Sequence, residues 1–116
     1  MKIIKQNDKN IAVINKQNKI NNKNDILDLL ADAYYLHNAN AIIVYQESLH
    51  EDFFNLKTGF AGEILQKFSN SQVRLAIIGD FSLYNSKSLN SFITECNRGN
   101  LVYFTKDLNE AITSLS

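Results

Sequence analysis

Short apolar runs alternate along the chain with longer segments in which apolar and polar residues are mixed. The clearest run, Leu75–Ile78, is rich in β-forming residues, is too short for a helix, and stops at Gly79-Asp80. An uninterrupted apolar run of this length is typical of a strand buried on both faces of a sheet. We expect strands at residues 73–80, 10–15, 41–45 and 101–104, and a weaker, charged edge strand at residues 2–7.

Between these runs, apolar residues recur every three or four positions, which is the period of an amphipathic helix. The pattern predicts helices over about residues 24–37, 58–68, 86–98 and 107–115. Asn24 and Thr58 are predicted N-caps, because short polar side chains accept hydrogen bonds from the first turn of a helix. Asp107 with Glu110 resembles a capping box, and Gly99 is a predicted left-handed terminator.

The predicted order of elements is β-β-α-β-α-β-α-β-α. Strands joined by helices pair in parallel through right-handed crossovers, and we expect helices on both faces of the sheet. Residues 7–10 predict a turn, so the first two strands form an antiparallel hairpin at one edge. We therefore predict one α/β domain over residues 1–116, with a mixed, mostly parallel five-stranded sheet and about four helices. The pattern leaves the order of the strands open.

Charge is balanced over the whole chain but unevenly distributed. The formal net charge is zero, whereas nucleic-acid binders usually carry a basic footprint, so we expect no nucleic-acid partner. Residues 1–24 contain six lysines and one acid, a net charge of +5, and the remainder therefore carries −5. Lysines on an edge hairpin prevent pairing with other chains, and a patch facing phosphate or carboxylate groups is the alternative.

Cys96 is the only cysteine, which excludes an internal disulfide and fits a reducing compartment. The first residues do not resemble a signal peptide, and no apolar run approaches the ~20 residues of a membrane helix. We expect a cytoplasmic protein that is not embedded in a membrane.

Polar candidates gather where parallel strands end and helices begin, the edge at which open α/β sheets bind ligands. The residues expected at this edge are Glu47, Thr58, Gly59, Gly62, Asp80, Ser82 and Ser86. Two glycines in one helical turn each cost roughly 1 kcal/mol relative to alanine. Close packing of the helix on the sheet would explain them, as would an anion or a partner surface meeting free N–H groups. Asp80, directly after a strand, is expected to cap its own turn.

Sequence motifs for catalysis are missing. The chain has no glycine-rich nucleotide loop and no Gly-x-Ser-x-Gly elbow, and Cys96 lies on an apolar helical stripe where thiols are usually inert. Glu47, His50, Glu51 and Asp52 could be read as a metal site, but they include only one histidine, and adjacent acids before a helix are normally exposed surface. We expect no metal and no cofactor, and the missing motifs favour a non-enzymatic protein over an enzyme.

The segments Phe54–Phe68, Val73–Ser82 and Ser86–Gly99 resemble a small bacterial family known only as a domain of unknown function, number four-one-eight-zero. More remotely, the order of elements is similar to that of the SpoIIAA-like sulfate-transporter and anti-sigma-factor-antagonist (STAS) domains. That resemblance implies a phosphoacceptor at the start of the second main helix, where Thr58 lies. The Asp-Ser-Ser-Gly-like signature of STAS domains is absent, and the loop 46–57 is longer than their pattern.

The expected function is a non-enzymatic interaction or regulatory module that binds a protein partner or a second copy of itself. Docking is expected through the helix start Thr58–Gly62 and the loop Asp80–Ser88, with Thr58 as candidate phosphoacceptor. The alternative is a small-molecule binder, or an enzyme, that takes an anionic ligand at the same edge, with Asp80 as a polar anchor and helix N–H groups as the anion site.

Overall fold

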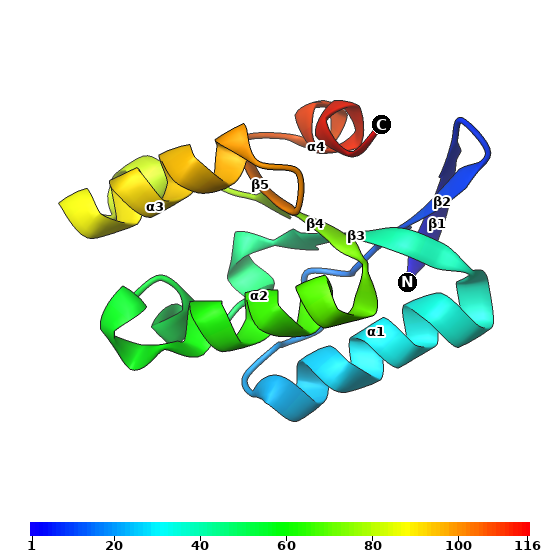
Figure 1. The fold of residues 1–116 in the computed structure, drawn as a ribbon, viewed down its shortest axis with the longest axis horizontal. Coiled ribbons are helices and arrows are strands. Elements are labelled where there is room, and N and C mark those ends of the chain that lie inside the picture. Colours follow the sequence, from blue (N-terminus) through cyan, green and yellow to red (C-terminus); the bar gives the residue numbers. More distant parts are fainter.

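The computed structural model describes residues 1–116 and contains one five-stranded sheet in the order β1-β2-β3-β4-β5. The strands are β1 (Lys2–Gln6), β2 (Lys9–Val13), β3 (Ala39–Tyr45), β4 (Arg74–Ile78) and β5 (Val102–Thr105). The helices are α1 (Lys23–His37), α2 (Phe60–Ser71), α3 (Lys87–Arg98) and α4 (Leu108–Leu115) (Figure 1). Short 3₁₀ turns lie at Gln46–Ser48, Glu51–Phe53, Leu56–Thr58 and Phe81–Leu83.

The predicted fold class is confirmed. β1 pairs with β2 antiparallel, and every other neighbouring pair is parallel. The hairpin turns at Asn7 and Asp8, which both have positive φ values, of 52° and 64°. Two left-handed residues make the tight turn that matches the twist of a hairpin, and asparagine and aspartate tolerate that conformation.

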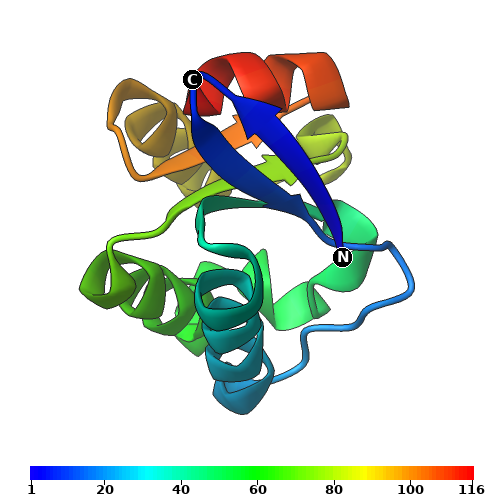
Figure 2. The ribbon, with the colours of Figure 1, turned by 90° about the vertical axis from the view of Figure 1, so that its right-hand side faces the viewer.

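Three of the four helices cover the same face of the sheet. Each parallel strand lies next to the preceding one, so the right-handed crossovers place α1, α2 and α3 on one side. Only α4, which follows the last strand, packs on the opposite face (Figure 2). Helices on both faces were predicted, but this three-to-one division depends on the strand order and could not be read from the sequence.

The alternation of side chains along the strands divides the apolar interior into two layers. Ile42 and Val44 of β3 belong to a cluster of 22 buried residues beneath α1, α2 and α3. Ile43, between them, belongs to a cluster of eight on the α4 side. The uninterrupted apolar runs predicted strands that are buried on both faces. The structure explains these runs, because each central strand contributes side chains to both clusters.

Two helix boundaries and one terminator differ from the prediction. The N-cap of α1 is Asn22, whose side chain accepts the N–H of Asp25 at 3.0 Å, and not Asn24. Asp25 in turn accepts the N–H of Asn21 at 2.8 Å, a reciprocal arrangement that a cap at residue 24 would lose. Gly99 has a φ of −87°, and the left-handed C-caps are instead Asn38 and Gln72.

The second boundary that differs is the start of α2. This helix begins at Phe60, and its N-cap is Gly59 and not Thr58. The predicted start of α4 at Asp107 is confirmed, because its carboxylate accepts the N–H of Glu110 at 2.8 Å.

The longest helix, α1, has 15 residues, and no helix has both the length and the apolar composition of a membrane span.

Arg74 fixes the C-terminal end of α4 to the sheet. Its guanidinium donates to the carbonyl oxygens of Ser114 and Leu115 at 3.1 and 3.0 Å. It also donates to the carbonyl of Asn100 and to the hydroxyl of Tyr103, at 3.0 and 2.8 Å. The last carbonyls of a helix have no partner within the helix and carry partial negative charge, so a cation there is doubly favourable.

We expect Arg74→Gln to lower the free energy of unfolding by about 2 kcal/mol, because several charge-assisted hydrogen bonds are lost together. Arg74→Lys should recover less than half of this loss, since one ammonium cannot reach the divergent partners of a guanidinium. Urea denaturation measures the loss, and amide exchange should localise it to α4. Arg98→Gln, which removes only an exposed ion pair with Glu95 at 3.5 Å, is the matched control. Equal stability of the Arg74→Gln variant and the control would contradict this role.

Candidate functional site

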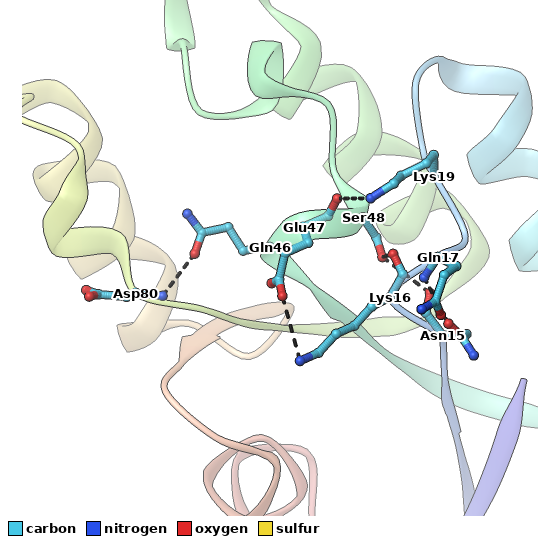
Figure 3. A network of polar contacts seen from close by, with 8 residues as sticks. All are labelled: Asn15, Lys16, Gln17, Lys19, Gln46, Glu47, Ser48 and Asp80. Atoms are coloured by element: carbon cyan, nitrogen blue, oxygen red, sulfur yellow. Dashed lines mark hydrogen bonds and ion pairs between the residues drawn. The ribbon is translucent and has the colours of Figure 1, made fainter.

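The loops that follow β2 and β3 are joined at the carboxyl edge of the sheet. Ile20 donates its N–H to the carbonyl of Ser48 at 2.7 Å and accepts the N–H of His50 at 3.0 Å. The buried Ser48 hydroxyl lies 3.4 and 3.2 Å from the carbonyls of Asn15 and Lys16 (Figure 3). These contacts hold the loop 15–20 against the loop 46–50 as one surface.

Glu47 faces this first loop and not the rest of the predicted site. Its carboxylate lies 3.7 Å from the ammonium of Lys16, and its carbonyl accepts a hydrogen bond from Lys19 at 2.9 Å (Figure 3). Both side chains of the Lys16–Glu47 pair are more than half exposed, so the pair contributes little to stability.

Gln46 joins β3 to the loop after β4. Its side-chain oxygen accepts the N–H of Asp80 at 2.9 Å, and its side-chain nitrogen donates to the Tyr84 hydroxyl at 2.9 Å. A Cβ atom at Gly79 would lie only 2.2 Å from that oxygen and 2.6 Å from the Gln46 Cβ. Only glycine at position 79 leaves space for this side chain. Sequence reasoning missed Gln46, although a glycine at a strand end is a known signal of close approach.

Asp80, Ser82 and Ser86 form caps within their own loop. One Asp80 oxygen accepts the Ser82 hydroxyl at 2.6 Å and the Ser82 N–H at 3.1 Å. Both hydrogen bonds lower the pKa of the exposed Asp80 carboxyl, and the bond from the Ser82 hydroxyl has the larger effect. Ser86 accepts the N–H of Leu89 at 3.2 Å and is the N-cap of α3. The prediction that Asp80 caps its own turn is confirmed.

Thr58 is also bound within its own loop. Its hydroxyl lies 2.7 Å from the carbonyl of Asp52 and 2.9 Å from that of Asn55, and it accepts the N–H of Phe60 at 3.2 Å. The hydroxyl is exposed but already serves as donor and acceptor. It therefore stabilises the turn before α2 without being the N-cap that was predicted.

The two glycines beside Thr58 have different explanations. Gly59 has a φ of +77°, a left-handed conformation that favours glycine. No atom lies within 4 Å of a Cβ built at Gly62, which faces solvent while Ala61 and Ile64 pack inward. The predicted close packing of this helix turn is therefore wrong, and nothing in the structure requires glycine at position 62.

Aromatic packing brings the segment 51–58 and the loop 80–88 together. The ring of Phe54 stacks on Tyr84, with centroids 4.9 Å apart and planes 15° apart, and it contacts Phe81 at 6.0 Å. Between the two segments lies a groove of about 440 Å³, lined by Phe54, Asn55, Leu56, Lys57, Ser86 and Ser88. Leu83, on the same loop as Ser86 and Ser88, is 76% exposed. Thr58 and Ser86 are thus on one surface, while Glu47 is on another.

A second, larger hollow of about 520 Å³ lies where β2 and β3 end, next to the start of β1. Its apolar floor includes Val13, Ile14 and Tyr45, and its polar rim includes Lys2, Asn15, Lys16 and Gln17. The Lys16 ammonium lies 4.8 Å from the centroid of the Tyr45 ring. Sequence reasoning noted the lysine excess of this region but did not place a hollow there.

Other reactive side chains have structural roles. Burial raises the pKa of the half-buried Cys96 thiol, and the neighbouring Glu95 adds to the rise, so the reactive thiolate is disfavoured. His50 accepts the N–H of Asp52 at 3.0 Å. No three histidine, cysteine, aspartate or glutamate side chains come together in a group that could hold a metal ion.

Comparison with known proteins places the chain in a family. The family model described as a domain of unknown function (DUF4180) matches residues 5–115. This chain belongs to the DUF4180 family. No curated protein and no solved structure gives a significant match. The resemblance noted at residues 54–99 is therefore confirmed, and membership brings no assigned activity to this DUF4180 protein.

We expect Gly79→Ala to destabilise the DUF4180 domain by about 2 kcal/mol, because the new Cβ would overlap the Gln46 side chain. Gln46→Ala in the same chain should recover part of this loss by removing the overlapping atoms. Gly62→Ala is the control, since its Cβ meets open space and should raise stability by up to about 1 kcal/mol. Thermal and urea denaturation of Gly79→Ala, Gln46→Ala, the double variant and Gly62→Ala measure the coupling. Additive losses at positions 46 and 79 would contradict the contact.

Proposed function

We propose that this DUF4180 protein is a cytoplasmic, non-enzymatic interaction module that docks a protein partner through the segment 55–62 and the loop Asp80–Ser88. The observation that carries the proposal is the exposed side chain of Leu83, 76% accessible, on the same loop as Ser86 and Ser88, which line the groove. An apolar anchor next to a groove is what a partner surface recognises, because a few well-placed side chains supply most of the binding energy.

The loop that carries Leu83 is held in place on both sides. Asp80 caps the turn before it, and the Tyr84 hydroxyl after it accepts a hydrogen bond from Gln46. The rings of Phe81 and Tyr84 pack on Phe54. A prearranged anchor loses little conformational entropy when a partner binds, which supports docking through this loop.

The order of elements resembles that of STAS domains, and on that resemblance alone we add regulation to the proposal, with Thr58 as candidate phosphoacceptor. A phosphate on the Thr58 oxygen would remove the hydroxyl donor and bring negative charge next to the carbonyls of Asp52 and Asn55. Those contacts support one wall of the groove. Modification at Thr58 would therefore loosen the wall and weaken docking.

The test is affinity capture from a lysate of the source organism, quantified by mass spectrometry. We expect Leu83→Asp and Lys57→Glu each to reduce recovery of a specific partner at least tenfold, because both alter the exposed surface and neither residue forms a hydrogen bond or ion pair within the chain through its side chain. Asn109→Asp, which adds a carboxylate on α4 across the sheet, is the matched control. Circular dichroism and thermal denaturation verify that each variant is folded. Undiminished recovery by both groove variants would contradict the proposal.

The hollow at Lys2 and Lys16 favours a second candidate function, the binding of a small anion at the same edge of the sheet. Its volume of about 520 Å³ falls within the range of ligand sites. Two lysines beside the Tyr45 ring suit a ligand that combines a phosphate or carboxylate with an apolar group. This site would be separate from Thr58 and Asp80.

Phenyl phosphate is a suitable probe for this second function. We expect it to raise the melting temperature in a saturable manner, since a ligand at a hundredfold its dissociation constant adds about 2.7 kcal/mol of stability. Lys2→Gln with Lys16→Gln should abolish the rise, while Lys5→Gln with Lys9→Gln, on the same hairpin, should keep it. Inorganic phosphate should act more weakly, because it leaves the apolar floor unfilled. An equal response of both double variants would count against the site.

A further inference from the structure

Helix α1 exposes an unusual amount of apolar surface. Tyr34, Tyr35 and Leu36 are consecutive and are 60%, 80% and 69% exposed, and Leu27 is 44% exposed. The side of the helix that joins the core is a different one, formed by Ile26, Leu29, Leu30 and Ala33. Large exposed apolar patches usually mark interaction sites. Leu27, Tyr34 and Tyr35 lie on one side of the helix and form an exposed stripe, whereas Leu36 points about 180° away from Leu27. None of these side chains packs against the buried clusters.

Part of this surface borders a groove between α1 and the end of α2, two helices that lie side by side (Figure 1). The groove has a volume of about 290 Å³ and is lined by Leu27, Leu30, Ala31, Tyr34, Tyr35, Ser71 and Val73. Ala31 is the smallest α1 side chain along it, which leaves room for another side chain. Val73 directly precedes β4, so the groove lies at the amino edge of the sheet, opposite to Leu83.

Acidic side chains form one flank of the exposed stripe. Asp28 is exposed and lies three residues before Ala31 and seven before Tyr35, which places it next to them on the helix surface. Asp32, one helical turn after Asp28, is also exposed. Neither carboxylate forms an ion pair, and the nearby Lys19 donates its hydrogen bond to Glu47. Asp28 and Asp32 line a separate hollow together with Lys19, whose hydrogen bond to a neutral carbonyl leaves its charge in place. A partner in the groove would therefore meet these carboxylates at the edge of the groove, beside Tyr35.

We propose that the α1–α2 groove docks an amphipathic helix of a partner protein, with apolar residues on its inner face and lysine or arginine on one flank. Helices commonly bind in this way, by placing apolar side chains at helical spacing into a groove between two others. The basic flank complements Asp28 and Asp32 and directs the partner into one orientation.

The same charges argue against two other occupants. An antiparallel pairing of two copies about Ala31 would place the Asp28 and Asp32 carboxylates of both chains on the same side, where they repel. An anionic lipid surface would be repelled as well. The proposal is independent of the docking surface at Leu83, because the two sites share no residue.

The probe is a fluorescent peptide of about fifteen residues, built from leucine and lysine so that the leucines fall on one helical face. We expect saturable binding to the full chain in fluorescence anisotropy. Ala31→Gln, which fills the groove without changing charge, should weaken binding at least tenfold, and Tyr35→Ala, which removes one wall, should weaken it as well. Asp28→Asn with Asp32→Asn should weaken binding severalfold and reduce its dependence on salt. Leu83→Asp is the matched control and should leave binding unchanged.

Three results would overturn this inference. The first is equal binding of a peptide in which glutamate replaces lysine, since the acidic flank would then have no role. The second is unaltered binding by both the Ala31→Gln and Tyr35→Ala variants, which remain folded because both positions are exposed. The third is concentration-dependent dimerisation in sedimentation experiments that Ala31→Gln abolishes, which would assign the groove to a second copy of the chain.

Discussion

The architecture depends on one constraint, the right-handedness of the connections between parallel strands. Since β2, β3, β4 and β5 lie in sequential order, each connection turns the same way and all three crossover helices cover one face. The opposite face is left to α4, a helix of eight residues that is joined to the sheet by Arg74. This short terminal helix is the only one that covers the second apolar layer, so the layer stays covered only if the helix is held to the sheet.

The same constraint determines what the carboxyl edge can be. Open α/β sheets bind ligands where the strand order reverses, because neighbouring loops diverge to opposite faces there and leave a crevice. In this sheet the order never reverses, so the loops after β3 and β4 run side by side and bind each other through Gln46, Asp80 and Tyr84. Polar groups at this edge are occupied in joining loops, and the exposed apolar Leu83 becomes its most distinctive feature.

The sequence allowed most elements to be predicted, because buried strands and amphipathic helices impose distinct periods on the chain. It did not allow the contact between Gln46 and Gly79 to be predicted, since their 33-residue separation in sequence is closed only by the pairing of β3 with β4. The N-cap of α1 could not be predicted either, because residues 21–24 contain three asparagines that could each serve. Asn22 is the N-cap because its side chain accepts the N–H of Asp25, whose carboxylate accepts the N–H of Asn21. The exposed stripe of α1 could not be predicted, because the helical period does not show which apolar residues face the core when a helix has apolar residues around most of its circumference.

Helix α2 connects the two proposed docking surfaces. It begins at Phe60, whose N–H is bound by Thr58 beside the first groove, and it ends at Ser71, which lines the second. Under the two proposals, a displacement of its start at the Thr58 turn would reach the wall of the α1–α2 groove through this helix. Any effect of one partner on the affinity of the other must be reciprocal, because both would bias the position of the same element. Leu83 lies at one edge of the sheet and Tyr35 at the other, so under the two proposals the protein would be an adaptor with one helix between its two surfaces.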